Sequence, residues 1–184
     1  MNRREFAGFA AIAPLIAAAA AQERSVKAAE TPLVLGPERA RVYTIGHGEA
    51  RILVGAEQSE GAWWLGTISS DPGRKTSLHL HHSMDEQVYV LDGVLSAWLD
   101  GHWQELPAGG LVVVPRGVPH AIGNRTQQPM RYLGAGNPAG FEKFFADIEI
   151  AARNHPYSSP EFLTDLKNIY TKYDSKLVGP PPVG

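Results

Sequence analysis

The 184-residue sequence contains no cysteine. This absence excludes disulfide bonds, thiolate metal sites, a cysteine nucleophile and a lipoprotein anchor, although it is compatible with any cellular compartment. A basic excess is missing as well, because the formal net charge is −2 at pH 7. Since the chain has neither a basic stripe nor a helix-turn-helix pattern, it gives no support for binding to nucleic acid or to an anionic membrane.

The N-terminal segment lacks a hydrophobic run that clearly exceeds the length needed to span a membrane. A twin arginine at residues 3–4 precedes an uncharged, alanine-rich stretch at 7–22, and a small-x-small pattern ends at Ala21. These features resemble a twin-arginine export signal cleaved near Ala21 and predict an exported, periplasmic protein. The alternatives are a mature N-terminal helix or a membrane anchor, but Pro14 interrupts the stretch, which is marginal in length for a span. We therefore expect no stable membrane insertion of the mature chain.

The chain divides by composition into four segments. The export signal at 1–21 is followed by a polar, flexible lead-in at 22–37, a strand-rich domain at 38–136 and a helical extension at 137–184. Without the leader, which carries two arginines and one glutamate, the net charge becomes about −3. No internal repeat is visible, and this length allows one domain with a substantial core.

Short β-like segments follow one another closely through the central region, with Asp92-Gly93 and Asp100-Gly101 among the turns that separate them. The predicted strands are 41–45, 51–54, 62–68, 77–81, 87–91, 94–99, 103–106, 111–114, 120–122 and 130–133. Many short strands at this spacing predict an all-β fold, either an antiparallel double sheet or a barrel.

The hydrophobic period changes from two to about 3.6 in the last part of the chain, which predicts two α-helices. The first helix places one face at Phe141, Phe144, Phe145, Ile148 and Ala152. The second carries Phe162, Leu163, Leu166, Ile169 and Tyr170 on one side. Residues 137–138 are expected to cap the first helix, residues 159–160 to start the second, and Gly179 to stop further structure. We expect the helices to pack on the barrel; covering its mouth or a subunit partner are the alternatives.

One segment places three candidate metal ligands within eight residues. His79 and His81 are two apart, so an extended strand directs both imidazoles to one face. Glu86 opens the next predicted strand, which ends at the hairpin dipeptide Asp92-Gly93. Two adjacent antiparallel strands would therefore offer two imidazoles and a carboxylate to one cavity.

A fourth candidate ligand, His120, begins a strand after a turn stiffened by Pro115, Gly117 and Pro119. Each of these residue types alone is usually a solvated or hydrogen-bonded strand residue. Together, imidazole nitrogen and carboxylate oxygen predict one divalent transition metal ion, although this ligand set does not distinguish Fe, Mn, Ni, Cu, Co and Zn. Four protein ligands on an octahedral ion leave two positions for substrate, water or dioxygen.

These residues and their intervals closely resemble the two sequence motifs of the cupin superfamily. The first motif is matched by Gly73, His79, His81, Glu86 and Gly93, and the second by Gly109, Pro115, Gly117, His120 and Asn124. The resemblance implies a single cupin unit, an antiparallel β-barrel of the double-stranded β-helix or jelly-roll type, with a three-histidine, one-glutamate metal site. It extends to about residue 135, and one copy of each motif indicates a monocupin.

Residues near the ligands are candidates for a substrate pocket. Val88 and Val90 share the strand parity of Glu86 and should line the same cavity, and Trp64 and Phe141 are aromatic candidates. Packing in the barrel core is the alternative for the aromatic residues, and only one of the adjacent Trp63 and Trp64 can face inward. Four other histidines, which lie outside the ligand set, are expected on the surface or behind the ligands: His47, His82, His102 and His155. Asn124 is expected to brace its turn.

An apolar barrel around such an ion suits a reaction in which an enolic or phenolic substrate chelates the metal and meets dioxygen. The ligand set and a tail beginning Gly-Phe-Glu-x-Phe-Phe at 140–145 resemble single-domain quercetin-dioxygenase-like cupins. The resemblance implies a metal-dependent oxidoreductase acting on an aromatic or enolic small molecule. A non-redox isomerase or decarboxylase and a non-catalytic periplasmic binding module are the alternatives. Pairing through barrel edges would make the protein a homodimer.

Glu86 has two candidate roles at this site. As a bound carboxylate it would balance the charge of the ion, and as the catalytic base it would accept a proton from a substrate hydroxyl. The second role requires a substrate oxygen within hydrogen-bonding distance.

Overall fold

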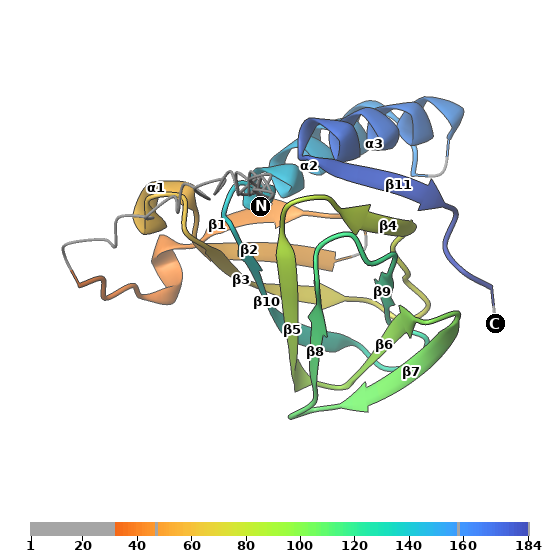
Figure 1. The fold of residues 1–184 in the computed structure, drawn as a ribbon, viewed down its shortest axis with the longest axis horizontal. Coiled ribbons are helices and arrows are strands. Elements are labelled where there is room, and N and C mark those ends of the chain that lie inside the picture. Colours follow the sequence, from red (N-terminus) through yellow and green to blue (C-terminus); the bar gives the residue numbers. More distant parts are fainter. Residues whose placement is uncertain (1–31, 47, 158, 184) are drawn as a thin grey trace, which may run out of the picture.

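The structure, a computed structural model, describes residues 32–46, 48–157 and 159–183. The predicted export signal and its cleavage near Ala21 lie outside these residues. Antiparallel strands form a barrel, and two C-terminal helices lie along one side of it (Figure 1). The predicted all-β barrel with two C-terminal helices is thereby confirmed.

The larger sheet has six strands in the order β1-β2-β3-β10-β5-β8. Their bounds are β1 Arg41–Thr44, β2 Gly48–Val54, β3 Trp64–Ser70, β10 Met130–Asn137, β5 Asp85–Asp92 and β8 Leu111–Val114. Along β5, Glu86, Val88 and Val90 are buried while alternate residues are more exposed. The predicted strand parity is therefore confirmed, because these three side chains share the inner face.

Five further strands complete the barrel. They are β4 Leu78–His81, β6 Val94–Leu99, β7 His102–Pro107, β9 Ala121–Gly123 and β11 Ser175–Gly179. The order β7-β6-β9 forms one sheet, and β11 pairs with β4 in another. Isolated bridges join the two, pairing His79 with His120 and Lys75 with Gly123. These bridges place the end of the second motif directly beside the first.

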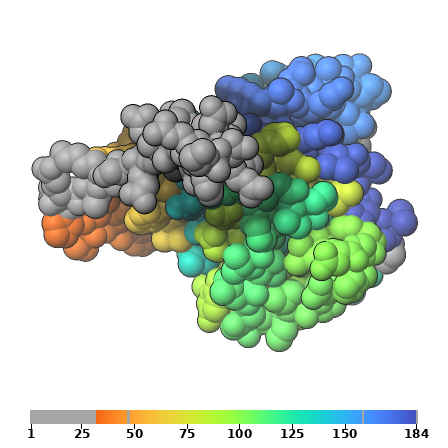
Figure 2. All heavy atoms as spheres, in the orientation of Figure 1, coloured from red at the N-terminus to blue at the C-terminus, as the bar shows by residue number. Residues whose placement is uncertain are grey.

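The helical segments are η1 Pro37–Arg39, α1 Ala56–Ser59, η2 Phe141–Lys143, α2 Phe144–Asn154 and α3 Pro160–Lys172. Helix α3 begins where the sequence predicts, because the Ser159 hydroxyl accepts a hydrogen bond from the Phe162 amide at 3.1 Å. Helices α2 and α3 pack on the barrel as expected, and Figure 2 shows this segment in blue as a layer over the strands. Within the described ranges, no helix has the length and apolar character to cross a membrane.

The interior contains two hydrophobic clusters. One lies within the barrel between β5, β6, β8 and β10, and the other lies between β2, β3 and the C-terminal helices. Trp64 is 1% exposed and belongs to the second cluster, whereas Trp63 is 44% exposed. The structure thus assigns the inward member of the tryptophan pair, and it shows that α2 and α3 share the core of the domain.

One local prediction at the C-terminal extension is wrong, and one strand there was missed. Residues 137–138 do not cap the first helix, because β10 continues through Asn137 and the helical turn begins only after Gly140. The strand β11, which ends at Gly179 where the sequence predicts an end of regular structure, follows the second helix and pairs with β4, and the sequence pattern did not predict it. Strand β11 has only five residues, so its alternation of more and less buried side chains is too short to identify a strand from the sequence alone.

Candidate metal centre

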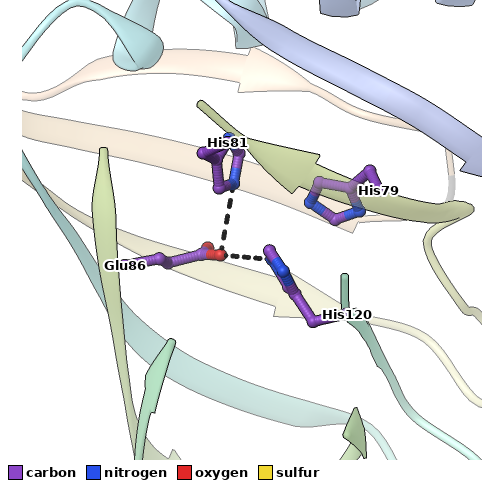
Figure 3. Close-up of side chains that lie close together, drawn as sticks. All are labelled: His79, His81, Glu86 and His120. Carbon is purple, nitrogen blue, oxygen red and sulfur yellow. Dashed lines mark hydrogen bonds and ion pairs between the residues drawn. The ribbon is translucent and has the colours of Figure 1, made fainter. Parts of the chain in front are cut away.

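The structure brings all four predicted ligands together inside the barrel. Figure 3 shows His79, His81, Glu86 and His120 pointing toward a common space. Their ligand atoms all lie within 4.8 Å of one another, near the separations of roughly 3–4 Å that a shared ion with bonds of about 2.1 Å would impose. Each of the four residues is at most 9% exposed.

Strand pairing creates this convergence. In β4, His79 and His81 are buried while Leu78 and Leu80 are less so, as the two-residue period requires. Reciprocal backbone hydrogen bonds of 3.0 and 2.8 Å join His79 to His120, so the third imidazole stands beside the first. Glu86 reaches the same space from β5, where it lies opposite Val114 and Gly136.

The hydrogen bonds to Nδ1 determine which ring nitrogen each histidine offers. His79 Nδ1 lies 2.8 Å from the Ser77 carbonyl oxygen, and His120 Nδ1 lies 2.9 Å from that of Val118. A carbonyl oxygen can only accept, so each Nδ1 carries a proton and donates it. Nε2 of these rings is therefore the nitrogen that faces the cluster, which is the arrangement that metal-binding histidines adopt.

His81 is oriented by a residue of the C-terminal strand. Its Nδ1 lies 2.8 Å from the Ser175 hydroxyl oxygen, and that hydroxyl donates to the Tyr173 carbonyl oxygen at 2.9 Å. Because the only proton of the hydroxyl is used in this way, its oxygen must accept the proton of His81 Nδ1. All three imidazoles thus carry a proton on Nδ1 and direct Nε2 inward.

The charges of the cluster fit a cation site. Burial, reinforced by His120 and His81, lowers the pKa of His79 to about 3, so this ring is neutral at pH 7. Burial alone would raise the pKa of Glu86, but its contacts with His120 and His81 outweigh burial and hold the pKa below its usual range. Burial likewise opposes the charged form of His120, and the Glu86 contact raises its pKa above the usual value. The carboxylate is therefore ionised.

Two contacts show what an ion would replace. His120 Nε2 lies 2.8 Å from Glu86 Oε2, and His81 Nε2 lies 3.4 Å from the same oxygen. His81 Nε2 is fully enclosed and has no hydrogen-bond partner in the part of the chain that the structure describes, a costly state for a buried nitrogen. An ion at this point would satisfy that lone pair and take the place of the proton between His120 and Glu86. The donor set and the unsatisfied nitrogen therefore fit a divalent transition metal.

The C-terminal extension supplies the aromatic wall of the cluster. The Phe141 ring meets the His81 ring edge-on with centroids 4.6 Å apart, and the Tyr170 ring lies 5.0 Å from that of His79. Trp64 packs behind Phe141 at 6.4 Å. These rings keep the imidazoles out of bulk water, which strengthens electrostatic interactions at the cluster.

The other predicted pocket residues are buried near the ligands. Val88 and Val90 are fully buried in the barrel cluster, and Trp64 and Phe141 belong to the cluster under the helices. Of these four, only Phe141 has a ring contact with a candidate ligand. Whether any of them contacts a substrate stays a prediction.

Residues around the site behave as their positions predict. His82 is exposed next to buried His81, and His102 is exposed as well. His155 is partly exposed and lies 3.6 Å from Asp165, while His47 lies outside the described residues. Asn124 braces its turn, since its side-chain amide donates to the Ser70 and Gln128 carbonyl oxygens.

Sequence reasoning missed Ser175 and Tyr170 as neighbours of the ligands. Ser175 is 94 residues from His81 and belongs to the unpredicted strand β11. Tyr170 was recognised only as part of the apolar face of its helix. The histidine-to-carbonyl contacts at i−2, in contrast, follow from the extended backbone around His79 and His120 and could have been anticipated.

Comparisons with known proteins agree with this geometry. Residues 66–135, which include all four candidate ligands, match the family described as "Cupin domain". Quercetin 2,3-dioxygenase from Bacillus subtilis (strain 168) is 26% identical over 132 residues, covering 71% of this chain and 39% of that protein. An uncharacterized protein from Methanocaldococcus jannaschii is 33% identical over 66 residues, covering 36% of this chain and 53% of that protein. The chain thus spans less than two thirds of the length of either relative.

Solved structures show the same architecture. KdgF from Halomonas sp. superposes with a TM-score of 0.54 at 16% identity, covering 61% of this chain and 98% of that chain. An RmlC-like cupin from Shewanella frigidimarina NCIMB 400 gives a TM-score of 0.52 at 20% identity, covering 61% of this chain and 96% of that chain. At these identities the likeness concerns the fold alone. The chain therefore has a cupin-like fold, with residues 66–135 matching the cupin domain, and its barrel holds three histidines and one glutamate that could bind a metal ion.

Proposed function

We propose that the protein is a metal-dependent oxidoreductase, a dioxygenase that acts on an aromatic or enolic small molecule. The observation that carries this proposal is the convergence of three inward-facing Nε2 atoms and one carboxylate within an aromatic wall. A divalent transition metal on these ligands would supply open coordination positions where a substrate oxygen and dioxygen can meet. Similarity to quercetin 2,3-dioxygenase over 71% of the chain favours this reaction class.

The residues of the chain would divide the work of binding, exclusion of water and proton transfer. The three histidines hold the ion through nitrogens whose orientation is set by their Nδ1 hydrogen bonds. Phe141 and Tyr170 shield the imidazoles. Among the ligands, the side chain of Glu86 is 12% exposed, compared with 2% for His81 and 0% for His120. A substrate hydroxyl therefore has better access to Glu86 than to these histidines.

Metal analysis and oxygen consumption test the reaction class. The full exported protein should be purified from its native host and analysed for metals, and a panel of flavonols and small enols should then be assayed with an oxygen electrode. Substrate loss that stops under anaerobic conditions is expected. Turnover that continues without oxygen would instead indicate a non-redox isomerase or decarboxylase, and tight binding without product under either atmosphere would indicate a binding module.

A conservative substitution separates the two roles of Glu86. Glu86→Gln keeps an oxygen ligand but removes the ability to accept a proton, so a catalytic base predicts retained metal and a decrease in kcat of about 10²- to 10⁴-fold. A purely structural ligand predicts loss of metal in the same variant. Ser83→Ala is the control, because Ser83 is exposed in the same β4–β5 connection.

We also propose that the mature protein is periplasmic and pairs as a homodimer. The leader pattern supports export. Edge strand β8 supports pairing, because Leu111 and Val113 are each more than half exposed and Leu111 lies opposite exposed Tyr89. Light scattering should give twice the chain mass for the wild type and the monomer mass for Val113→Lys, while N-terminal sequencing of the periplasmic fraction should locate the cleavage near Ala21.

A further inference from the structure

A cavity of about 390 Å³ lies between the barrel and the C-terminal helices. This volume is within the range of small-molecule sites. Strand β3 contributes Ile68, β10 contributes Met130, and the helices contribute Phe144, Ile148 and Phe162 among other apolar residues. The cavity therefore has the size and the apolar surface to enclose one aromatic ring system.

The side chain of Tyr170 connects this cavity with the candidate metal centre. None of the four ligands lines it, but Tyr170 does, and the Tyr170 ring lies 5.0 Å from that of His79. Ser77 also lines it, and the Ser77 carbonyl accepts the Nδ1 hydrogen bond of His79. A molecule in the cavity would thus lie beside the His79 edge of the cluster.

Two tyrosine hydroxyls in the cavity wall have no hydrogen-bond partner among the described residues. Neither Tyr132 nor Tyr170 forms a side-chain hydrogen bond among the described residues, although Tyr170 is only 4% exposed. The fully enclosed and unpartnered side-chain atoms of the described residues belong to His81 and Trp103, so the tyrosine hydroxyls open onto accessible space. A tyrosine hydroxyl is protonated at neutral pH, so both groups can donate a hydrogen bond.

The charge around the cavity has one sign. Arg74 and Lys75 line it, and no aspartate or glutamate of the described ranges does. Arg74 lies over the Tyr157 ring at 5.9 Å, and Lys75 lies over the Trp103 ring and donates to the Pro182 carbonyl. Neither cation has a carboxylate partner within the described part of the chain. An anion in the cavity would supply the missing counter-charge.

We propose that the cavity binds a small aromatic carboxylic acid. The ring lies among the apolar and aromatic side chains, the carboxylate faces Arg74 and Lys75, and an oxygen substituent accepts a hydrogen bond from Tyr132 or Tyr170. As an assignment of the substrate class, the inference rests on the proposed function. Binding itself requires only the cavity and its charges, so it can be measured with or without metal.

The test compares an acid with its uncharged isostere. The full mature chain, both metal-free and metal-loaded, should be titrated calorimetrically with 4-hydroxycinnamate and with 4-hydroxycinnamamide. The acid should bind at least tenfold more tightly than the amide, and this preference should decrease with added salt. Equal affinities, or no binding of the acid at millimolar concentration by protein with an intact thermal transition, would overturn the proposal.

Substitutions locate the source of the preference. Arg74→Gln and, independently, Lys75→Gln should each reduce acid affinity about tenfold and leave amide affinity unchanged. Arg131→Gln is the matched control, because Arg131 is exposed on β10 and does not line the cavity. Tyr170→Phe should reduce the affinity for the acid and the affinity for the amide by the same several-fold factor. A preference that survives both cavity substitutions, or is lost equally in the control, refutes the assignment.

The two proposals fail separately. Acid binding without oxygen consumption on any aromatic acid, flavonol or enol refutes the dioxygenase assignment and leaves the cavity assignment supported. Oxygen-dependent turnover of neutral flavonols or enols without acid binding refutes the cavity assignment alone.

Discussion

Ser175 provides the sharpest test of how the candidate metal centre is built. Its hydroxyl oxygen accepts a hydrogen bond from His81 Nδ1 at 2.8 Å while donating to the Tyr173 carbonyl. Ser175→Ala removes the acceptor from a ring that is 2% exposed, where water has little room to replace it. We expect the change to weaken metal binding much more than it weakens folding.

The reason is a change in the preferred tautomer. Without the serine, the His81 proton can move to Nε2, which lies 3.4 Å from the ionised Glu86 carboxylate. Metal binding must then return this proton to an Nδ1 that has no partner. An unsatisfied buried donor costs about 1–3 kcal/mol, which corresponds to about 5- to 150-fold in metal affinity. This range overlaps the roughly 10- to 100-fold effect typical of residues that orient metal-bound histidines.

The assay uses Ni²⁺ as the probe, titrated against a chelating competitor at fixed pH. Ser175→Ala should lose about 10- to 100-fold in affinity, and Ser175→Thr, which keeps a hydroxyl, should retain most of it. Ser83→Ala is the matched control on an exposed serine. Nitrogen NMR of the metal-free histidines should show the Nδ1–H tautomer at His81 in the wild type and a shift toward Nε2–H in the variant.

Two results would refute this reasoning. Unchanged Ni²⁺ affinity in a folded Ser175→Ala protein would show that His81 is oriented by its strand alone. A wild-type His81 with its proton on Nε2 would show that the hydroxyl donates to the ring, contrary to the inferred direction of the hydrogen bonds.

Three further variants test the supporting structure. Phe162→Ala should lower the free energy of unfolding, measured by chemical denaturation, by about 3–5 kcal/mol, because the Phe162 ring is 2% exposed in the core shared by barrel and helices. Leu163→Ala is its control and should lower the free energy of unfolding by less than about 2 kcal/mol, because Leu163 is 48% exposed. Gly136→Ala should destabilise by about 1–3 kcal/mol, because the added methyl group would clash with the Trp64 and Met84 side chains, while Gly179→Ala has open space and serves as its control. Asp85 accepts hydrogen bonds from the Arg116 side chain and backbone, which lower its pKa to about 2. The wild type should therefore be more stable than Asp85→Asn at neutral pH. This difference in the free energy of unfolding should decrease as pH falls from about 4 toward 2 in acid-denaturation curves.

The candidate ligands could be predicted because their signal is local. His79 and His81 are related by the two-residue period of a strand. Glu86 follows a short connection at the start of the next strand, and His120 follows a turn that contains Pro115, Gly117 and Pro119. Such patterns involve residues that are close in the sequence, so they can be recognised without knowledge of the tertiary fold. The same local logic predicted that Val88 and Val90 share the inner face with Glu86, which the burial pattern confirms.

The orienting contacts could not be predicted because they depend on distant strand pairing. Ser175 meets His81 only through the register of β11 against β4, in which these two residues are direct partners. A shift of that register by one residue would turn the hydroxyl to the opposite face. The start of the first helix was misplaced for a related reason, since the pairing of β10 with β5 extends the strand through Asn137 and overrides the local preference for a cap.

These distant contacts assign a functional role to the C-terminal extension. The match to the cupin domain ends at residue 135, and the ring against His81, the ring against His79 and the hydroxyl that orients His81 all come from later residues. The same extension forms one wall of the cavity. The barrel therefore supplies the ligands, whereas the extension determines the tautomer of one ligand and the shape of the space beside another. Since one fold can host several functions, the residues that select the substrate of this chain should be sought at the contact between barrel and extension.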